Sequence, residues 1–148
     1  MMVRGFEIVS QYVGCGITLP VRKTVSSAGY DIAAGQDATL SPGKVTLVPT
    51  GLKAYMGSDE YLGIHIRSGL AVKQSLSLIN GQGIIDADYY NNPDNEGHIL
   101  IAVFNHGDQP VVITKGTRLA QGIFYKYLIV DNDRPGGERL GGLGSTGQ

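Results

Sequence analysis

Short, β-branched apolar runs bounded by turn residues are the feature that most constrains the fold of this chain. KVTLVPTG, HILIAVFN and QGIFYKYLIV are three such runs, and glycine or proline separates most of them from the next. Runs of this length and composition are typical of β-strands. An apolar repeat of 3.6 residues nowhere persists for three turns, so the one helix expected is short and lies around SGLAVKQ. The pattern predicts an all-β fold, a jelly-roll-like barrel or sandwich.

The chain divides into one domain and a tail. Its 148 residues suit a single domain, since domains of about 150 residues bury enough surface to be stable. Residues 131–148 are charged and rich in glycine, and we expect them to form a flexible C-terminal arm after a β domain at residues 1–130. The last ten residues, RLGGLGSTGQ, read either as a frayed terminus or as a phosphate-binding segment, because glycine-rich turns with Ser and Thr cradle phosphate.

Charge and cysteine content exclude several classes of protein. Twelve basic residues against thirteen acidic ones leave a net charge of −1, whereas a protein that tracks a nucleic-acid backbone shows a strong basic excess. The start of the chain lacks the features of a signal peptide, and no apolar stretch approaches the length of about 18 residues that a membrane span needs. The one cysteine, Cys15, cannot form an intramolecular disulfide. We expect a cytoplasmic protein that binds neither a nucleic-acid polymer nor a membrane.

Two stretches in the first half of the chain carry polar residues suited to an anion. SSAGYDIAAG places Asp31 among glycines and small apolar residues, which is also the composition of an ordinary turn into a strand. RSGLAVK places Arg67 and Ser68 where a strand ends and the short helix begins. A helix N-terminus with a hydroxyl and a guanidinium beside it favours an anion, but Ser68 serves equally well as the N-cap of that helix.

The segment NGQGIIDADYY holds the most informative carboxylate. Its first four residues form a tight turn between two apolar runs, which predicts a hairpin. Asp86 follows inside an apolar run, where aspartate is rare because burying it without partners is costly. If Asp86 and Ile84 point inward, Asp86 is a carboxylate in a pocket, suited to general-base work; if they point outward, it is a solvated strand residue. Tyr89 and Tyr90 form either a stacking surface or half-buried packing.

A fourth stretch, KGTRLAQGIF, puts Arg118 and Gln121 near the start of a strand, where Arg118 taken alone is a surface arginine. Taken in order, AGYDIAA, RSGLAVK, NGQGIIDADYY, GTRLAQGIF and RLGGLGSTG resemble the five short motifs of the trimeric dUTP pyrophosphatases, the dUTPase family. The resemblance runs from about Ala28 to Gln148. It implies a jelly-roll subunit, a homotrimer with three active sites at subunit interfaces, and Mg²⁺-dependent hydrolysis of dUTP to dUMP and pyrophosphate.

The resemblance also implies roles for individual residues. Asp86 would be the general base that orients and deprotonates the water attacking the α-phosphorus. Asp31 would hold Mg²⁺ through a water, while the triphosphate binds most of the metal's coordination sphere. The phosphates would be bound by Arg67, Ser68, Gly69, Arg118 and Gln121. Uracil would occupy a slot formed by Asn80, Gly83 and Ile85, with Tyr89 under the deoxyribose. The arm would close over the site of a neighbouring subunit with Arg139, Leu143, Gly144, Ser145 and Thr146.

Three features depart from the usual family pattern. Leu143 stands where the arm usually has a phenylalanine that stacks on uracil. Arg139 lies one residue closer to the glycine-rich core than in many members, which makes Arg134 a weaker candidate for part of the phosphate role. Tyr90 and the insert at residues 91–98, NNPDNEGH, replace a common short ending of the third motif. We interpret the insert as an acidic surface loop.

Three alternatives have sequence features of their own. A dCTP deaminase relative would share the jelly roll and the trimer, but that branch uses a glutamate where GIIDADYY has aspartates. A non-catalytic ligand of a regulatory protein, as some phage dUTPases are, would tolerate Leu143, whereas the intact Asp86 and Gln121 argue against loss of catalysis. A structural jelly-roll protein without a ligand predicts that nucleotide does not protect the arm from proteolysis.

Leu143→Phe tests the first departure. Leucine can cover a base but cannot stack on it, and base–aromatic stacking is worth about 1–3 kcal/mol. On the reaction that the resemblance implies, we expect Leu143→Phe to raise kcat/KM for dUTP by about fivefold or more, measured as pyrophosphate release. Leu140→Phe, at the other leucine of the arm, is the matched control. An unchanged kcat/KM in Leu143→Phe would count against stacking as the missing interaction.

Overall fold

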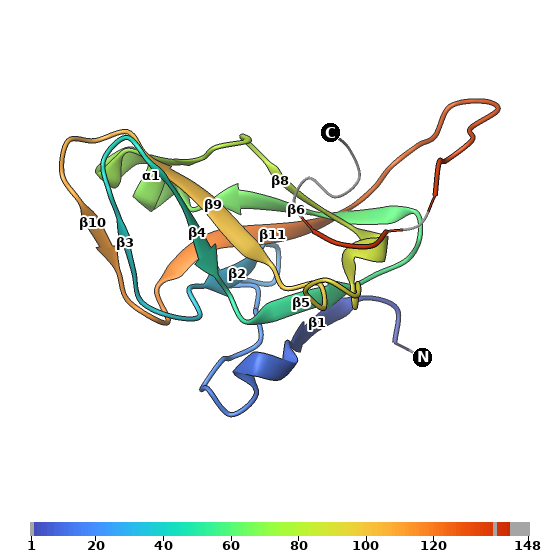
Figure 1. The fold of residues 1–148 in the computed structure, drawn as a ribbon, viewed down its shortest axis with the longest axis horizontal. Helices are drawn as coiled ribbons and strands as arrows, with labels where there is room; N and C mark the ends of the chain where they lie inside the picture. Colours follow the sequence, from blue (N-terminus) through green and yellow to red (C-terminus); the bar gives the residue numbers. More distant parts are fainter. Residues whose placement is uncertain (1, 138, 143–148) are drawn as a thin grey trace.

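The computed structural model describes residues 2–137 and 139–142, and within them the chain folds into β-strands with one short α-helix (Figure 1). The arm residues Leu143, Gly144, Ser145 and Thr146 lie outside the described residues. The helix α1 spans Ser68–Gln74, and the 3₁₀ turns η1 and η2 span Ser10–Tyr12 and Ala87–Tyr89. The strands are β1 (Gly5–Ile8), β2 (Tyr30–Ala33), β3 (Ala38–Leu40), β4 (Val45–Pro49), β5 (Leu52–Tyr55), β6 (Glu60–Ile66), β7 (Leu76–Leu78), β8 (Gly83–Asp86), β9 (Leu100–Asn105), β10 (Val111–Ile113) and β11 (Arg118–Lys126).

The strands of the described residues form four antiparallel sheets around a hydrophobic core. The sheet orders are β2-β11-β6-β8, β4-β9-β7, β10-β3 and β1-β5. In Figure 1 the strands β4 and β9 cross over β11, so the two larger sheets form two layers. The core joins fully buried side chains of both layers, with Ile32 and Leu62 from one and Val48 and Val103 from the other. The all-β sandwich expected from the sequence is confirmed.

Alternation along β2 and β11 separates a core face of their sheet from an outer face. Ile32 of β2 is opposite Ala120 of β11, and both are fully buried. Asp31 and Gln121, each one residue away, are opposite each other and lie on the outer face. The polar residues of the first and fourth motifs therefore share one surface.

The strand β8 presents Asp86 on the same outer face. Exposure alternates along the strand: Ile84 is 58% exposed and Asp86 is exposed, while Gly83 and Ile85 are half-buried. Asp86 is opposite Tyr61 of β6. Of the two orientations that the sequence left open, the outward one is therefore correct within one chain.

The helix α1 begins directly after β6 and has about two turns. Arg67, whose backbone is extended, is the N-cap residue, and its carbonyl accepts hydrogen bonds from the amides of Leu70 and Ala71. Ser68 is the first helical residue, so the alternative that made it the N-cap is wrong. Ser75 ends the helix because its backbone is left-handed, with φ 56°. Among residues 2–137 and 139–142, none of the helices has the length and apolar composition of a membrane span.

The turn at residues 80–83 joins two different sheets. The strand β7 before it pairs with β9, whereas β8 after it pairs with β6. The tight turn itself is present, because the backbone N–H of Gln82 donates a hydrogen bond to the backbone carbonyl of Asn80 at 2.8 Å and Gly81 has φ +76°. The predicted hairpin is wrong, since a turn between two apolar runs has the same sequence pattern when the second run crosses to another sheet.

The insert at residues 91–98 is compact. Asn92 is 5% exposed, and the carboxylate of Glu96 pairs with the ammonium of Lys53 at 2.7 Å. The amide and the hydroxyl of Ser10 also donate to Glu96. The insert does lie at the surface, with Asn91, Pro93 and Asp94 exposed. The structure adds that Glu96, one of its two acids, is neutralised and that its second residue is buried.

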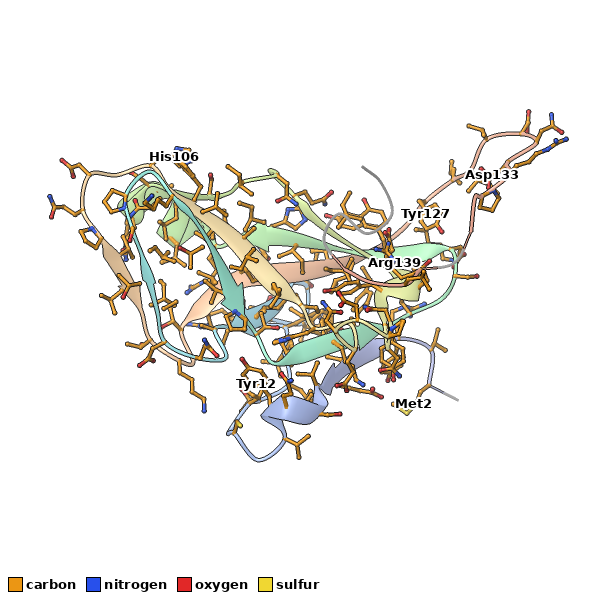
Figure 2. All side chains as sticks on the ribbon, in the orientation of Figure 1. Met2, Tyr12, His106, Tyr127, Asp133 and Arg139 are labelled. Atoms are coloured by element: carbon orange, nitrogen blue, oxygen red, sulfur yellow. The ribbon has the colours of Figure 1, made fainter. Side chains whose placement is uncertain are left out.

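The segment after β11 leaves the domain and returns to it. Leu128, Ile129 and Val130 are 97%, 69% and 73% exposed. Figure 2 shows Asp133 at the far end of the projecting loop and Arg139 back against the body of the domain. The division into a domain at residues 1–130 and an arm at residues 131–148 stays a prediction.

His98, at the end of the insert, is expected to make stability depend on pH. Its Nε2 accepts a hydrogen bond from the amide of Gly51 at 2.9 Å, which requires a neutral ring nitrogen. Burial lowers the pKa of His98 below its usual 6.5, and the nearby Glu96 opposes this shift. Below pH 6.5 the unfolded chain binds a proton here that the folded chain resists, so the free energy of unfolding falls as the pH falls.

We therefore expect the urea midpoint to drop between about pH 7.5 and about pH 5.5, and to drop less in His98→Gln, which has no group that titrates there. His106→Gln, at a histidine bonded to Ser77 instead of a backbone amide, is the matched control and should follow the unmodified protein. Equal slopes in the unmodified protein and His98→Gln would assign the pH dependence to another group.

Candidate active site

Four of the residues expected to bind phosphate or metal meet in one cavity. The four are Asp31, Arg67, Ser68 and Gln121, and they come from β2, the start of α1 and β11. The cavity has a volume of about 180 Å³ and is lined by Lys23, Ser27, Gly29, Asp31, Arg67, Ser68 and Gln121. We refer to it as the Asp31 pocket.

A glycine is needed for the side chain of Gln121 to enter this pocket. A β-carbon at Gly29 would overlap Oε1 of Gln121 and would lie 3.0 Å from its Cβ. The glutamine therefore crosses residue 29 at van der Waals contact, beside Asp31, its partner across the strands. Gln121 can keep this conformation only with a glycine at position 29.

Cationic side chains dominate the surroundings of Asp31. Nη1 of Arg118 lies 3.4 Å from Oδ2 of Asp31, and Nη1 of Arg67 donates to the carbonyl of Arg118 at 3.4 Å. An adjoining cavity of about 420 Å³ continues this surface past Arg22 and Lys23. Four basic side chains thus line the two cavities that share Asp31 as their one carboxylate, so this surface favours a ligand with several negative charges.

The loop before β2 supplies contacts that the sequence reasoning missed. Nη1 of Arg22 donates to the carbonyls of Val25 and Ser27 at 2.5 and 3.1 Å, and these bonds close the loop. Lys23 and Ser27 therefore reach the Asp31 pocket. The available signal was the basic pair RK shortly before AGYD, which has no turn or strand pattern of its own.

A second cluster surrounds Asp86 at the end of β8. The side chain of Asp86 is 52% exposed and forms an ion pair with Arg139, which lies against the domain in Figure 2. Nε of Arg139 also donates to Oδ1 of Asp88 at 3.0 Å, and its guanidinium carbon lies 5.8 Å from the ring centroid of Tyr89. The expected base, the expected sugar contact and the arginine of the arm therefore lie together, with Arg139 bound to carboxylates.

The remaining expected site residues lie beside these clusters. Asn80 is exposed in the turn before β8, and Gly83 and Ile85 are half-buried within that strand, next to Asp86. Gly69 follows Ser68 in α1, and the space that its β-carbon would occupy is open. The backbone at the mouth of the Asp31 pocket is therefore accessible.

The two clusters occupy opposite edges of one sheet. Asp31 is on β2 and Asp86 is on β8, with β11 and β6 between them. Asp31 is level with His65 of β6, whereas Asp86 is level with Tyr61, four residues away along the strand. With strands about 4.8 Å apart and a rise of about 3.4 Å per residue, the Cα atoms of Asp31 and Asp86 are about 20 Å apart. One chain does not place its own Asp86 beside its own Asp31 pocket.

The donor set around Asp31 limits which metal site can form. Among the described residues, no group of three His, Cys, Asp or Glu side chains could hold a metal ion. The Asp31 pocket offers one carboxylate. Mg²⁺ is commonly bound through one or two carboxylates together with substrate phosphates and waters. The pocket therefore fits a metal that arrives with an anionic ligand.

Comparison with known proteins identifies the family. The family model described as dUTPase matches residues 16–140. The chain belongs to the dUTPase family. It is 50% identical, over 149 residues that cover 99% of each chain, to the deoxyuridine 5'-triphosphate nucleotidohydrolase of Lactococcus lactis subsp. lactis (strain IL1403).

Solved dUTPases have the same fold. The crystal structure of dUTPase from Streptococcus mutans matches with a TM-score of 0.80 at 44% identity, covering 86% of this chain and 99% of that one. A dUTPase from phage phi11 of S. aureus matches with a TM-score of 0.74 at 18% identity, covering 90% of this chain and 96% of that one, a likeness that shows the fold alone. The jelly-roll-like fold and the family expected from the sequence are confirmed.

The dUTPase match covers the four internal motifs and the start of the fifth. Asp31, Arg67, Asp86 and Gln121 lie within the matched residues, and the structure places them in the two clusters. The roles that the family resemblance implies for them stay predictions, as do those of residues 143–146, which lie outside both the match and the described residues.

Proposed function

We propose that this dUTPase family member hydrolyses dUTP to dUMP and pyrophosphate with Mg²⁺, as a homotrimer whose active sites form between subunits. The Asp31 pocket carries the proposal, because motif residues distant in sequence converge there among basic side chains. A relative that is 50% identical over the full chain is named for this reaction. The reaction removes dUTP before uracil is incorporated into DNA and supplies dUMP for dTMP synthesis.

The Asp31 pocket binds the triphosphate. Arg67, Arg118 and Lys23 supply positive charge, and hydrogen bonds between such groups and phosphate are roughly twice as strong as neutral ones. Ser68 and Gln121 add neutral donors, and the open backbone at residue 69 allows close approach of phosphate oxygens. Together these groups hold the chain of phosphates and stabilise the charge that develops on the leaving pyrophosphate.

Asp31 would hold Mg²⁺ through a water. A single carboxylate fits a cation whose other ligands are phosphate oxygens and waters. When bound, Mg²⁺ neutralises phosphate charge and so reduces repulsion toward the attacking oxygen. Arg118, 3.4 Å from Asp31, keeps that carboxylate turned into the pocket.

Asp86 acts as the general base. Half of its side chain is exposed, so a water can reach it. Water attacks the α-phosphorus, its proton passes to the Asp86 carboxylate, and pyrophosphate leaves with the electron pair of the broken P–O bond. A base positioned in this way contributes about 10²–10⁴ in rate. Arg139, which pairs with Asp86, exchanges this carboxylate for a phosphate as the arm closes, and this exchange frees the base.

The turn and strand next to Asp86 select the nucleotide. Asn80 and the backbone from Gly83 to Ile85 offer hydrogen bonds to uracil, and cytosine presents the wrong donor and acceptor at the same edge. A site built for hydrogen bonds rejects such a mismatch by roughly 10⁴–10⁵. The methyl group of thymine meets the tight turn, and Tyr89 leaves no room for a 2′-hydroxyl.

A second subunit supplies the half of the site that one chain lacks. A general base must reach its proton within about 2.6–3.2 Å or through one water, whereas Asp31 and Asp86 of one chain are about 20 Å apart. Exposed apolar side chains flank both halves: Ile84 lies beside Asp86, and Val21 and Val25 lie beside the Asp31 pocket. Burying them between subunits is favourable.

We place the reaction in the cytoplasm. Cys15 is an exposed free thiol, and thiols of this kind stay reduced there. The small negative net charge fits a protein whose partners are dUTP and its own copies and not a nucleic-acid polymer.

Pyrophosphate release with Mg²⁺, compared for dUTP, dTTP, dCTP and UTP, tests the reaction. We expect rapid turnover of dUTP alone. Asp86→Asn keeps the shape of the side chain but removes the base, so kcat should fall by about 10²–10⁴ with little change in KM. Asp108→Asn, at an exposed aspartate outside both clusters, is the matched control. Full hydrolysis by Asp86→Asn would overturn the catalytic assignment.

Mixing two inactive variants tests whether subunits share each active site. Asp31→Ala disables the pocket and Asp86→Asn removes the base, so each homo-oligomer should be inactive. Unfolded together and refolded as a mixture, they should regain activity well above the sum of the two, because some sites then combine an intact pocket with an intact base. Each variant refolded alone is the control. No gain in the mixture would mean that one chain supplies both residues.

A further inference from the structure

The insert at residues 91–98 encloses the phenol of Tyr89. Tyr89 ends η2 and is 8% exposed. Its hydroxyl donates to the carbonyl of His98 at 2.5 Å and accepts a hydrogen bond from Nδ2 of Asn95 at 2.9 Å. Both partners belong to the insert, so this segment fixes the polar end of the tyrosine.

Asn95 is itself held in one orientation. Its Oδ1 accepts hydrogen bonds from Nδ2 of Asn92 at 2.8 Å and from the amide of Gly97 at 3.1 Å. These bonds point the Nδ2 group of Asn95 toward Tyr89, because an amide that accepts at one end must donate at the other. Nδ2 of Asn92 also donates to the backbone carbonyl of Tyr89 at 2.8 Å, so the insert binds the backbone of Tyr89 as well as its side chain.

The arm passes over this pair of side chains. A β-carbon at Gly142 would lie 3.0 Å from Nδ2 of Asn95 and 3.3 Å from Cε1 of Tyr89. The guanidinium of Arg139 also lies over the ring of Tyr89, with its carbon 5.8 Å from the ring centroid. The backbone of the arm at Gly142 therefore lies against both the Asn95 amide and the phenol, and the tyrosine ring is held at its hydroxyl end and covered on its face.

We propose that Asn95 is a positioning residue for Tyr89, and that it sets how strongly the enzyme prefers a deoxyribonucleotide to a ribonucleotide. The proposal rests on the proposed function, in which the ring of Tyr89 lies under the sugar. Tyr89 can exclude a 2′-hydroxyl by shape only if its ring keeps a fixed position under the sugar. The hydrogen bond from Asn95 prevents the ring from tilting away from the extra oxygen, and the other bonds of the insert hold Asn95 in place.

Asn95→Leu removes the hydrogen bond while keeping a side chain of similar size. We expect the ratio of kcat/KM for dUTP to kcat/KM for UTP to fall by about three- to tenfold, the range expected for one hydrogen bond. The ratio should fall because kcat/KM for UTP rises, while kcat/KM for dUTP changes little. In a Tyr89→Phe background, which lacks the hydroxyl, Asn95→Leu should change the ratio by less than about twofold, because the two substitutions remove the same interaction.

Asn91→Gly is the matched control within the insert. It removes the contact of Asn91 with Lys53 and suits the left-handed backbone at this position, φ 57°, but touches nothing on the Tyr89 side chain. It should lower stability and leave the ratio unchanged. Tyr89→Phe alone removes the hydrogen bond from Asn95 together with the one to the carbonyl of His98, and it leaves the side chains of the insert in place. An unchanged ratio in this variant therefore counts against the proposal even if Asn95→Leu fails to fold.

Two results would overturn the proposal: an unchanged ratio in Tyr89→Phe or in folded Asn95→Leu, or an equal fall caused by Asn95→Leu in the Tyr89 and Phe backgrounds. An equal fall would mean that Asn95 supports the loop and does not act through the phenol. Absence of dUTP turnover in the unmodified protein would instead contradict the proposed function, so the two failures are distinguishable.

Discussion

The antiparallel register of the sheet β2-β11-β6-β8 is the constraint on which the rest of the molecule depends. Because side chains alternate, a slip of β2 by one residue against β11 would turn Asp31 into the core and expose Ile32, while β11 stays paired with β6. The contact between Gln121 and Gly29 reinforces this register, since a larger residue at position 29 would overlap the glutamine. Burial of Ile32 and Ala120 in the core is thus what places Asp31 and Gln121 on the outer face of the sheet.

Charge is divided between the two edges of that sheet. Arg67 and Arg118 gather with other basic side chains at the β2 edge, whereas Asp86 and Asp88 stand at the β8 edge with Arg139 between them. This division suits a site assembled from two subunits. In the proposed function, the anionic substrate binds at the basic edge of one chain, away from Asp86 and Asp88 of that chain, and the base comes from a second copy whose Arg139 exchanges a carboxylate for a phosphate.

The insert shows how a polar loop becomes part of the structural framework of a site. Its backbone turns through left-handed residues and has few strand partners, so the side chains of Asn92 and Asn95 satisfy the loop amides. Buried polar groups are costly unless they are hydrogen-bonded. A loop in which one asparagine orients the next has essentially one low-energy arrangement, and Tyr89, bonded to it at both its carbonyl and its hydroxyl, takes up that arrangement.

The sequence by itself determined the class of fold, the short helix and most of the residues that gather in the two clusters, because β-branched runs, turn glycines and motif composition are local properties. It did not determine that the turn at residues 80–83 crosses between sheets, that Lys23 joins the Asp31 pocket, or that Asp86 points outward about 20 Å from Asp31. Those features depend on which distant strands pair and which faces are buried together. Only the tertiary structure decided them, because sheet order and register follow from packing the whole core, which no short segment contains.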